Sequence, residues 1–300
     1  MKKKGLKNKI DFSLVYNPHF IAQGTTIKNL EKPDLLLIGV DNQKTYQIIK
    51  RFYKKFYNEK IFKRTTFREG KISKIAINSY ITSKISFANY ISELCERTKD
   101  TDAKNVLNVV GEDKRINHSY LKIGTKFSGP CFPRDNLALS HYSKTKNVNS
   151  LLPDRNDEIN KIQSKRLVKI LKKLTRNIST YSVGICGMTY KNDTNIYKDS
   201  QGEDLIRLMI KEKMNYDKIN VYDNFLDKSY KIDSLKNRIR FFKNKKKFID
   251  NSDIIFVMYN IKNLNFFKTN TKKKKIIVDC WRCIENLPKN FEKIELGKFF

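Results

Sequence analysis

The chain has 300 residues and a mass of 35.4 kDa, which is enough for two domains and excludes a peptide or a disulfide-stapled mini-protein. Hydrophobic residues make up 39% and charged residues 31% of the chain, so it can build a core, which intrinsically disordered chains cannot. The net charge of +31 favours anionic ligands. However, the lysines are spread along the whole chain without an Arg-rich stripe or an RNA-binding aromatic motif, which argues against a nucleic-acid partner.

The sequence also indicates a cellular compartment. No apolar run approaches the roughly 20 residues that a membrane span needs, and residues 1–9 lead into a polar stretch rather than the apolar core of a signal peptide. Five cysteines, an odd number, do not form a disulfide framework, which fits a reducing compartment. We therefore expect a cytoplasmic protein with no membrane partner.

Residues 12–62 have the pattern expected at the end of an α/β domain. Residues 12–16 predict a short strand, Asn17-Pro18 predicts a turn, and residues 34–40 predict a buried strand. Asp41 is then placed to cap a helix that continues to about Tyr57. No Gly-rich strand-to-helix turn precedes these elements, so no complete nucleotide-binding βαβ unit fits before Asn17.

Residues 70–175 have the period of α-helices. Apolar residues at helical spacing predict one long helix over 72–95 and another over 159–174. Between them, residues 120–135 contain Gly124, Gly129, Pro130 and Pro133, which predict a tightly specified loop. We expect an all-helical segment that this loop interrupts.

From residue 182 onward, the pattern alternates between strands and helices. We predict strands over 182–186, 218–223, 254–258 and 275–279, and a helix over 201–213. Such alternation is typical of a doubly wound parallel sheet. The lysine clusters at 243–247 and 272–275 are predicted to be solvated loops.

Cys131 is the strongest candidate for a reacting group. It lies in the sequence Phe127-Ser-Gly-Pro-Cys-Phe-Pro-Arg-Asp135, directly before a predicted helix with Pro133 near its first position. The N–H groups and dipole of a helix N-terminus, together with the cation of Arg134, would stabilise a thiolate there. The alternative is a small residue buried in a tight loop.

Lys74 and Asn78 form a second candidate site. They are four residues apart and share a helix face, so an ammonium and an amide can converge on an oxyanion. The alternative is a solvated helix face.

The remaining motifs are weaker. Cys280-Trp-Arg-Cys283 has redox spacing without a second pair, and the three histidines have no metal-ligand spacing, so we expect no metal. Gly184-Ile-Cys-Gly187 falls short of the three-glycine phosphate fingerprint.

Four segments match, in order, the motifs of a known family. They are Asn17-Pro-His-Phe-Ile-Ala-Gln-Gly24 with Lys32-Pro-Asp-Leu-Leu-Leu-Ile-Gly39, then Lys74-Ile-Ala-Ile-Asn78 with Lys84-Ile-Ser-Phe-Ala-Asn89, then Arg115 and Tyr120-Leu-Lys122 with the Cys131 block, and finally Gly187-Met-Thr-Tyr-Lys-Asn-Asp-Thr194 with Asp199-Ser200, Tyr222-Asp223 and Val278-Asp279. The chain thereby resembles the UDP-glucose/GDP-mannose dehydrogenase family, from about residue 11 to its end. The Cys131 block is the most specific match.

The resemblance implies an α/β protein in three parts. Residues 1–68 would be the remnant of an N-terminal Rossmann-like domain that binds NAD. Residues 69–177 would be a central all-helical dimerisation domain with the catalytic cysteine loop. Residues 178–300 would form a C-terminal Rossmann-like doubly wound parallel sheet that binds the UDP-sugar.

The reaction that the resemblance implies is the NAD-dependent oxidation of a nucleotide sugar, most simply UDP-glucose to UDP-glucuronate. Cys131 would capture an aldehyde as a thiohemiacetal, which becomes a thioester and then an acid. GDP-mannose and UDP-N-acetyl sugars stay open as substrates. The product would supply polysaccharide biosynthesis.

Residue roles are implied in the same way. The catalytic residues would be Cys131, Lys74, Asn78 and Asp135, with Lys74 and Asn78 at the oxyanion. The substrate-binding residues would be His19, Phe20, Ile21, Gln23, Arg115, Lys122, Phe127, Lys191 and Arg282, of which Arg115 would act across a homodimer interface. The cofactor-binding residues would be Gln23, Cys131, Arg134 and Lys198.

The sequence also departs from the family. The G-x-G-Y-V-G turn, the ribose-binding acid and the catalytic threonine have no counterpart, so we expect most of the NAD-binding domain to be missing and to come from other sequence or a separate chain. His19 and Gln23 stand where the family has two glutamates, and Arg282 would replace an arginine usual at Trp281. The alternative function is a catalytically degenerate module that binds nucleotide sugars or serves assembly.

Overall fold

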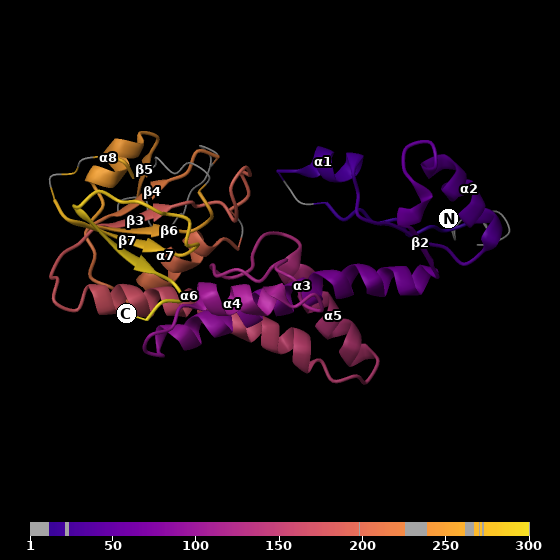
Figure 1. Cartoon of the computed structure of the whole chain (residues 1–300), viewed down its shortest axis with the longest axis horizontal. Coiled ribbons are helices and arrows are strands. Elements are labelled where there is room, and N and C mark those ends of the chain that lie inside the picture. Colours follow the sequence, from indigo (N-terminus) through magenta and orange to yellow (C-terminus); the bar gives the residue numbers. More distant parts are fainter. Residues whose placement is uncertain are drawn as a thin grey trace. The chain divides into compact units, whose positions relative to one another are not determined.

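The computed structural model describes residues 12–21, 24–197, 199–225, 239–261, 267–269, 271 and 273–299. It consists of two compact units, Met1–Ser79 and Tyr80–Phe300 (Figure 1). The 30-residue helix α3 (Phe67–Glu96) begins in the first unit and ends in the second. Among the described helices, none is long and apolar enough to cross a membrane.

The first unit is built on two parallel strands, β1 (Leu36–Gly39) and β2 (Phe62–Thr65). β1 falls within the strand predicted over 34–40, and all four of its residues are buried. Three short helical elements accompany the strands: α1 (Thr26–Glu31), α2 (Gln43–Tyr53) and a 3-10 turn (Glu59–Ile61). Leu36, Ile38, Val40 and Phe62 form the small core of this unit.

The strand predicted over 12–16 is wrong. Tyr16 makes one isolated antiparallel bridge, in which its N–H and carbonyl pair with those of Gly39 at 2.8 Å each. Pro18 follows two residues later and has no N–H with which to extend a ladder. Phe12 is a second isolated bridge residue, so the segment forms single bridges rather than a continuous strand.

The start of α2 also differs from the prediction. Asn42, not Asp41, caps the helix, because its side-chain oxygen accepts from the N–H of Thr45 at 2.8 Å. Asp41 instead accepts from the N–H of Phe67 at 3.1 Å, so it satisfies the first turn of α3. The helix ends at Tyr53, one turn before the predicted end.

The helical part of the second unit confirms the predicted all-helical segment. The helices predicted over 72–95 and 159–174 are α3 and α6 (Leu151–Leu174), and both begin earlier than predicted. Two shorter helices lie between them, α4 (Ala103–Glu112) and α5 (Phe132–Thr145). The cap of α4 is Asp102, which accepts from the N–H of Lys104 at 2.8 Å.

A buried ion pair joins α3 to α6. The guanidinium of Arg166 donates to both carboxylate oxygens of Glu96, with its Nε at 2.9 Å, and both side chains are almost fully buried. Arg166 also donates to Ser92 and Gln163 at 2.9 Å each. Glu96 in turn accepts from the N–H of Gly297 at 2.9 Å. The pair therefore has the additional hydrogen bonds that two buried charges require.

The C-terminal part is a sheet of six parallel strands in the order β5-β4-β3-β6-β7-β8. This is the 3-2-1-4-5-6 order of the Rossmann fold, so the predicted fold class is confirmed. Its strands and helices are β3 (Val183–Cys186), α7 (Gln201–Lys211), β4 (Ile219–Tyr222), β5 (Ile239–Phe242), α8 (Lys245–Asp250), β6 (Ile254–Val257), β7 (Lys275–Asp279) and β8 (Phe291–Glu295).

Three of these elements were missed by the sequence patterns. β5 and β8 are short and carry charged residues, which hides their strand period. The lysine cluster predicted as a loop at 243–247 contains the start of α8, where Asn244 caps the helix and Phe248 and Ile249 are buried. Burial of Phe248 and Ile249 therefore stabilises a helix here despite the lysines that precede them.

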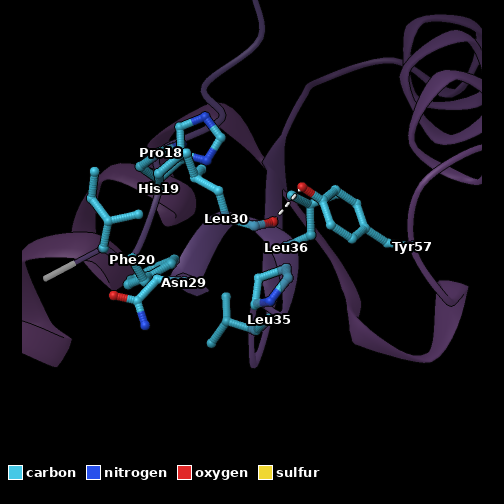
Figure 2. A pocket seen from close by; sticks show the side chains of 10 residues that line it. Pro18, His19, Phe20, Asn29, Leu30, Leu35, Leu36 and Tyr57 are labelled. Carbon is cyan, nitrogen blue, oxygen red and sulfur yellow. Dashed lines mark hydrogen bonds between the residues drawn. The ribbon is translucent and has the colours of Figure 1, made fainter. Parts of the chain in front are cut away.

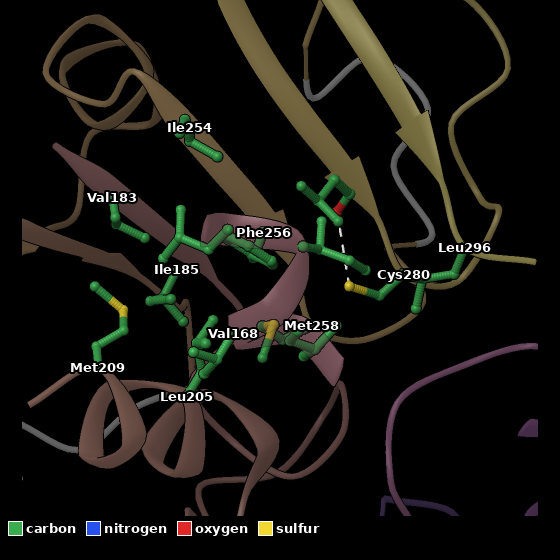
Figure 3. Packing of buried hydrophobic residues seen from close by; sticks show 14 of the residues in the cluster. Val168, Val183, Ile185, Leu205, Met209, Ile254, Phe256, Met258, Cys280 and Leu296 are labelled. Atoms are coloured by element: carbon green, nitrogen blue, oxygen red, sulfur yellow. Dashed lines mark hydrogen bonds between the residues drawn. The ribbon is translucent and has the colours of Figure 1, made fainter. Parts of the chain in front are cut away.

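Helices cover both faces of the sheet (Figure 1). Ile254 and Phe256 of β6 pack with residues of α6 and α7, whereas Ile255 and Val257 pack with Phe248 and Ile249 of α8. Figure 3 shows the larger cluster, in which labelled side chains of β3 and β6 meet those of α6 and α7. This alternation along β6 is what a strand buried on both faces requires.

We predict that Glu96→Gln lowers the free energy of unfolding by about 3 kcal/mol or more, because Arg166 keeps its charge in a buried site without a counter-ion. Denaturant unfolding followed by circular dichroism measures the change. Glu93→Gln is the matched control, since Glu93 of the same helix pairs with the exposed Arg97, which directly follows the helix. This change should cost at most about 0.5 kcal/mol. Equal losses in the two variants would contradict the prediction.

Candidate active site

Cys131 occupies the predicted position at the start of a helix. It is the residue before α5, and Pro133 lies in the first turn of that helix. Its side chain is exposed, whereas Cys95, Cys186 and Cys280 are buried. The alternative of a small buried residue therefore does not hold for Cys131.

The loop that leads to Cys131 is fixed by side-chain amides from three helices. Asn160 of α6 accepts from the N–H of Phe127 at 2.7 Å and donates to its carbonyl at 2.8 Å. Asn89 of α3 donates to the carbonyl of Thr125, and Gln201 of α7 donates to that of Lys126. These amides replace the strand partners that an irregular buried backbone lacks.

Two glycines of this loop allow close approach of aromatic rings. At Gly124 a Cβ atom would lie 3.0 Å from the ring of Trp281. At Gly129, where φ is +81°, it would lie 2.6 Å from the ring of Tyr190. Only glycine fits the second position without strain.

Two charged residues follow Cys131 at the start of α5. Asp135 is buried, and its Oδ1 accepts from the Nε and a terminal nitrogen of Arg134 at 2.9 Å each. The pKa of Arg134 is raised, chiefly by this hydrogen bond and then by the charge of Asp135, with a smaller contribution from Cys131. The cation predicted beside the thiol is thus present and is held in place by Asp135.

The remaining predicted residues of the second unit have different surroundings. Lys122 is exposed, and Phe127 is buried in the anchored loop. Arg115 is exposed and forms a two-point ion pair with Asp113. This pairing lowers the pKa of Asp113. Lys198 lies outside the described residues.

Arg282 is engaged in structural contacts. Its guanidinium donates to both carboxylate oxygens of Asp102 at 3.0 and 2.8 Å, and its Nε donates to Glu295 at 3.1 Å. These bonds tie the cap of α4 to the end of β8. A substrate would have to compete with two carboxylates for Arg282.

The loop after β3 carries Lys191 and is held by Asp223 at the end of β4. One carboxylate oxygen of Asp223 accepts from the N–H groups of Met188 and Thr189 at 2.7 and 2.8 Å and from the Thr189 hydroxyl at 2.9 Å. In a dinucleotide site the acid at this strand end binds ribose hydroxyls. Here one oxygen of Asp223 binds the loop after β3 and the other accepts from the N–H of Phe225 at 2.8 Å, so both oxygens are engaged by the chain itself.

The first unit contains the predicted residues His19, Phe20 and Ile21. They line a hollow of about 10 Å³ with Leu30, Tyr57 and neighbouring residues, which is room for about one water molecule. Figure 2 shows this hollow and the hydrogen bond from the Tyr57 hydroxyl to the carbonyl of Leu30, at 2.6 Å. Gln23 lies outside the described residues.

Asn17 and Lys74 explain two motifs of the first unit. Asn17 donates to the carbonyl of Leu37 at 2.7 Å and accepts from the Tyr53 hydroxyl at 2.5 Å, which fixes the Asn-Pro turn to β1. The ammonium of Lys74 lies 4.6 Å from the centre of the Phe20 ring, a cation–π contact. Asn78, four residues later on α3, is buried.

The structure therefore brings together Cys131, Arg134, Asp135 and Phe127 in one loop and helix start. It brings Lys74 to Phe20 in the other unit. Sequence reasoning missed Asn160 and Tyr190, which fix the Cys131 loop. From the sequence, Gly129 indicated only a turn and not the contact with Tyr190. The polar Asn160 within an apolar helix period was the available indication of a buried amide.

Comparisons with known proteins identify related sequences. Models of the UDP-glucose/GDP-mannose dehydrogenase family match residues 68–162 (central domain), 184–286 (UDP binding domain) and 1–57 (NAD binding domain). Because the last match is short, the expectation that most of the NAD-binding domain is missing is supported only in part.

The chain is 30% identical to a UDP-glucose 6-dehydrogenase of Gallus gallus over 72% of its length and 44% of the relative. It is 29% identical to UDP-glucose 6-dehydrogenase TuaD of Bacillus subtilis over 69% of its length and 44% of the relative. The chain thus spans about half the length of the curated relatives it matches.

Two solved structures are similar in fold. A UDP-glucose dehydrogenase from Pyrobaculum islandicum superposes with a TM-score of 0.84 at 22% identity, covering 97% of this chain and 65% of that chain. A UDP-D-ManNAc dehydrogenase from Pyrococcus horikoshii superposes with a TM-score of 0.78 at 18% identity, covering 99% and 67%.

We predict that Asn160→Leu destabilises the protein by about 2 to 4 kcal/mol, because both backbone groups of Phe127 lose their buried partner. Amide exchange at residues 127–131 should also become faster. The control Asn215→Leu removes an exposed bond to the carbonyl of Ser179 and should change stability by no more than about 0.5 kcal/mol. Unchanged exchange at the loop in Asn160→Leu would show that the amide does not hold it.

Proposed function

This chain belongs to the UDP-glucose/GDP-mannose dehydrogenase family, and we propose that it takes part in the NAD-dependent oxidation of a nucleotide sugar. The proposed substrate is UDP-glucose, because the related sequences named above are UDP-glucose 6-dehydrogenases. The observation that carries the proposal is the exposed Cys131 at the start of α5, within the region that matches the central domain of the family.

The chemistry assigned to Cys131 is nucleophilic. Its sulfur adds to the C6 aldehyde carbon of the sugar, and the aldehyde oxygen takes up a proton to give a thiohemiacetal. After oxidation, water attacks the resulting thioester, the C–S bond breaks, and the products are the carboxylate and the free thiol. Lys74 and Asn78 at the oxyanion, and Asp135 in organising the water, remain predictions from the resemblance.

NAD, when bound, is the hydride acceptor of this family's reaction. The described residues do not form a dinucleotide site by themselves, since Asp223 is engaged by its own loop and the first unit offers two strands and no Gly-rich turn among its described residues. We propose that sequence beyond the described residues, or a separate chain, completes that site. Arg134, beside Cys131, is the residue proposed to face the cofactor.

The substrate is proposed to bind through the loop after β3 and the Cys131 loop. Lys191 is a cation for the diphosphate, and Lys122 and Phe127 belong to the sugar pocket. Arg282 is better placed to hold α4 against β8 than to bind substrate, because Asp102 and Glu295 already occupy its guanidinium.

Calorimetric titration with UDP-glucose and, separately, with NAD tests this proposal. We expect saturable binding of UDP-glucose that persists in Cys131→Ala, and loss of any NADH production in that variant. GDP-mannose at the same ionic strength is the control for the nucleotide. Failure of wild-type protein to bind any nucleotide sugar would refute the proposal, and binding without turnover in the presence of the completing NAD-binding sequence would favour the degenerate binding module.

We also propose that the chain forms a homodimer through α3. Four exposed apolar side chains, Tyr80, Phe87, Tyr90 and Leu94, lie on one face of this helix. Light scattering should give twice the chain mass of 35.4 kDa. The double variant Phe87→Asp/Tyr90→Asp should be monomeric, whereas Val109→Asp, at a more exposed apolar site on α4, should not change the mass. A monomeric wild-type protein would exclude the dimer.

A further inference from the structure

The Asn-Pro turn of the first unit holds Phe20 in place. Asn17 binds the carbonyl of Leu37 and the hydroxyl of Tyr53, so the turn is fixed to β1 and to α2. The proline that follows Asn17 restricts the backbone further. Phe20, three residues after Asn17, is half-buried and lines the hollow of Figure 2. The position of its ring is therefore set by the turn that precedes it.

The ring of Phe20 contacts the ammonium of Lys74. The Nζ atom of Lys74 lies 4.6 Å from the centre of the ring, within the distance of about 6 Å at which a ring face attracts a cation. Lys74 is a half-buried residue near the start of α3, and both residues belong to the first unit. The contact therefore joins the Asn-Pro turn to α3.

The partner of Lys74 is an aromatic ring and not a carboxylate. Among the residues that the structure describes, no acidic side chain lies within ion-pair distance of its ammonium. A carboxylate would neutralise the ammonium and compete with an incoming anion for its N–H donors. The face of a ring attracts a cation through its quadrupole and carries no net charge. The ring can thus hold Lys74 while the positive charge stays available to a ligand.

We propose that Phe20 is a positioning residue for Lys74: the face of its ring holds the ammonium through a cation–π contact and leaves the charge available to an oxyanion. This role differs from the direct contact with substrate that the resemblance implies for Phe20. The proposal rests on the proposed function only in taking Lys74 as the group at the oxyanion.

Nuclear magnetic resonance of the whole chain with isotope-labelled lysine tests the contact without substrate or cofactor. Protons over the face of an aromatic ring resonate upfield, so the ε-methylene signal of Lys74 should lie upfield of the signals of exposed lysines. Lys74→Arg identifies this signal by its loss. In Phe20→Leu the signal should move to the position of the exposed lysines, whereas Phe20→Tyr, which keeps the ring, should retain the upfield position.

Phe67→Leu is the matched control, because the ring of Phe67 lies 4.5 Å from the ammonium of Lys71, one turn earlier on the same helix. This change removes a similar contact and should leave the Lys74 signal in place. A Lys74 signal among those of the exposed lysines in the wild type would overturn the proposal. Equal movements of that signal in Phe67→Leu and Phe20→Leu would overturn it as well.

The affinities of two nucleotide sugars test whether the charge is available to a ligand. UDP-glucuronate carries a carboxylate at C6 where UDP-glucose carries an alcohol, so the ratio of their dissociation constants reports on a cation near C6. We expect Lys74→Met to abolish the preference for UDP-glucuronate. Phe20→Leu should reduce this preference by about two- to fivefold, the effect of losing one cation–π contact, and Phe67→Leu should not change it.

Replacement of Phe20 by pentafluorophenylalanine covers the case in which Phe20→Leu does not fold. This residue keeps the shape of the ring and reverses its quadrupole, so the preference for UDP-glucuronate should fall at least as far as in Phe20→Leu. A ring that only fills space would leave the ratio of the two dissociation constants at its wild-type value, and that result would refute the positioning role.

These measurements separate the two proposals. An upfield Lys74 signal that is lost in Phe20→Leu, in a protein that binds no nucleotide sugar, would support the contact of Phe20 with Lys74 and refute only the dehydrogenase proposal. Binding of both nucleotide sugars, with a Lys74 signal that does not depend on Phe20, would do the reverse.

Discussion

The ion pair between Glu96 and Arg166 is the interaction on which the arrangement of the second unit depends. It is buried, so its two charges are stable only while α3 and α6 lie at the distance that lets them meet. The same two helices carry Asn89 and Asn160, which bind the backbone of the loop before Cys131. The position of the exposed Cys131 thiol thus depends on the buried ion pair between α3 and α6.

The loop before Cys131 is built in an unusual way for a buried segment. Within the part of the chain that the structure describes, it pairs with no strand, and side-chain amides bind its backbone instead. Such a loop can keep a shape that regular structure does not offer, with a left-handed glycine and an exposed residue at a helix start. Each buried backbone N–H and carbonyl group of such a loop then needs its own hydrogen-bond partner.

Local sequence patterns predicted most helices and strands, whereas they did not predict the contacts between these elements. The period of apolar residues predicted α3, α6 and four of the six strands of the C-terminal sheet. Burial of one face of an element places apolar residues at a regular spacing in the sequence. Cys131, Pro133 and the glycines marked the loop, because turn chemistry is local. The partners of Asn160 and Arg282 could not be predicted from local patterns, since they lie 33 and 180 residues away. Asp41 was misplaced for the same reason: its partner belongs to the next helix.

Gly297 is synthesised late, although it contacts helices that are synthesised early. Its N–H binds Glu96, its carbonyl accepts from Ala103, and a side chain there would collide with Ala103, Ser92 and Ile123. The ribosome makes this glycine some two hundred residues after Glu96. Until Gly297 has been synthesised, the carboxylate of Glu96 therefore lacks one of its hydrogen-bond donors. Such a long-range closing contact slows folding and prolongs the time during which chaperones can act on the nascent chain.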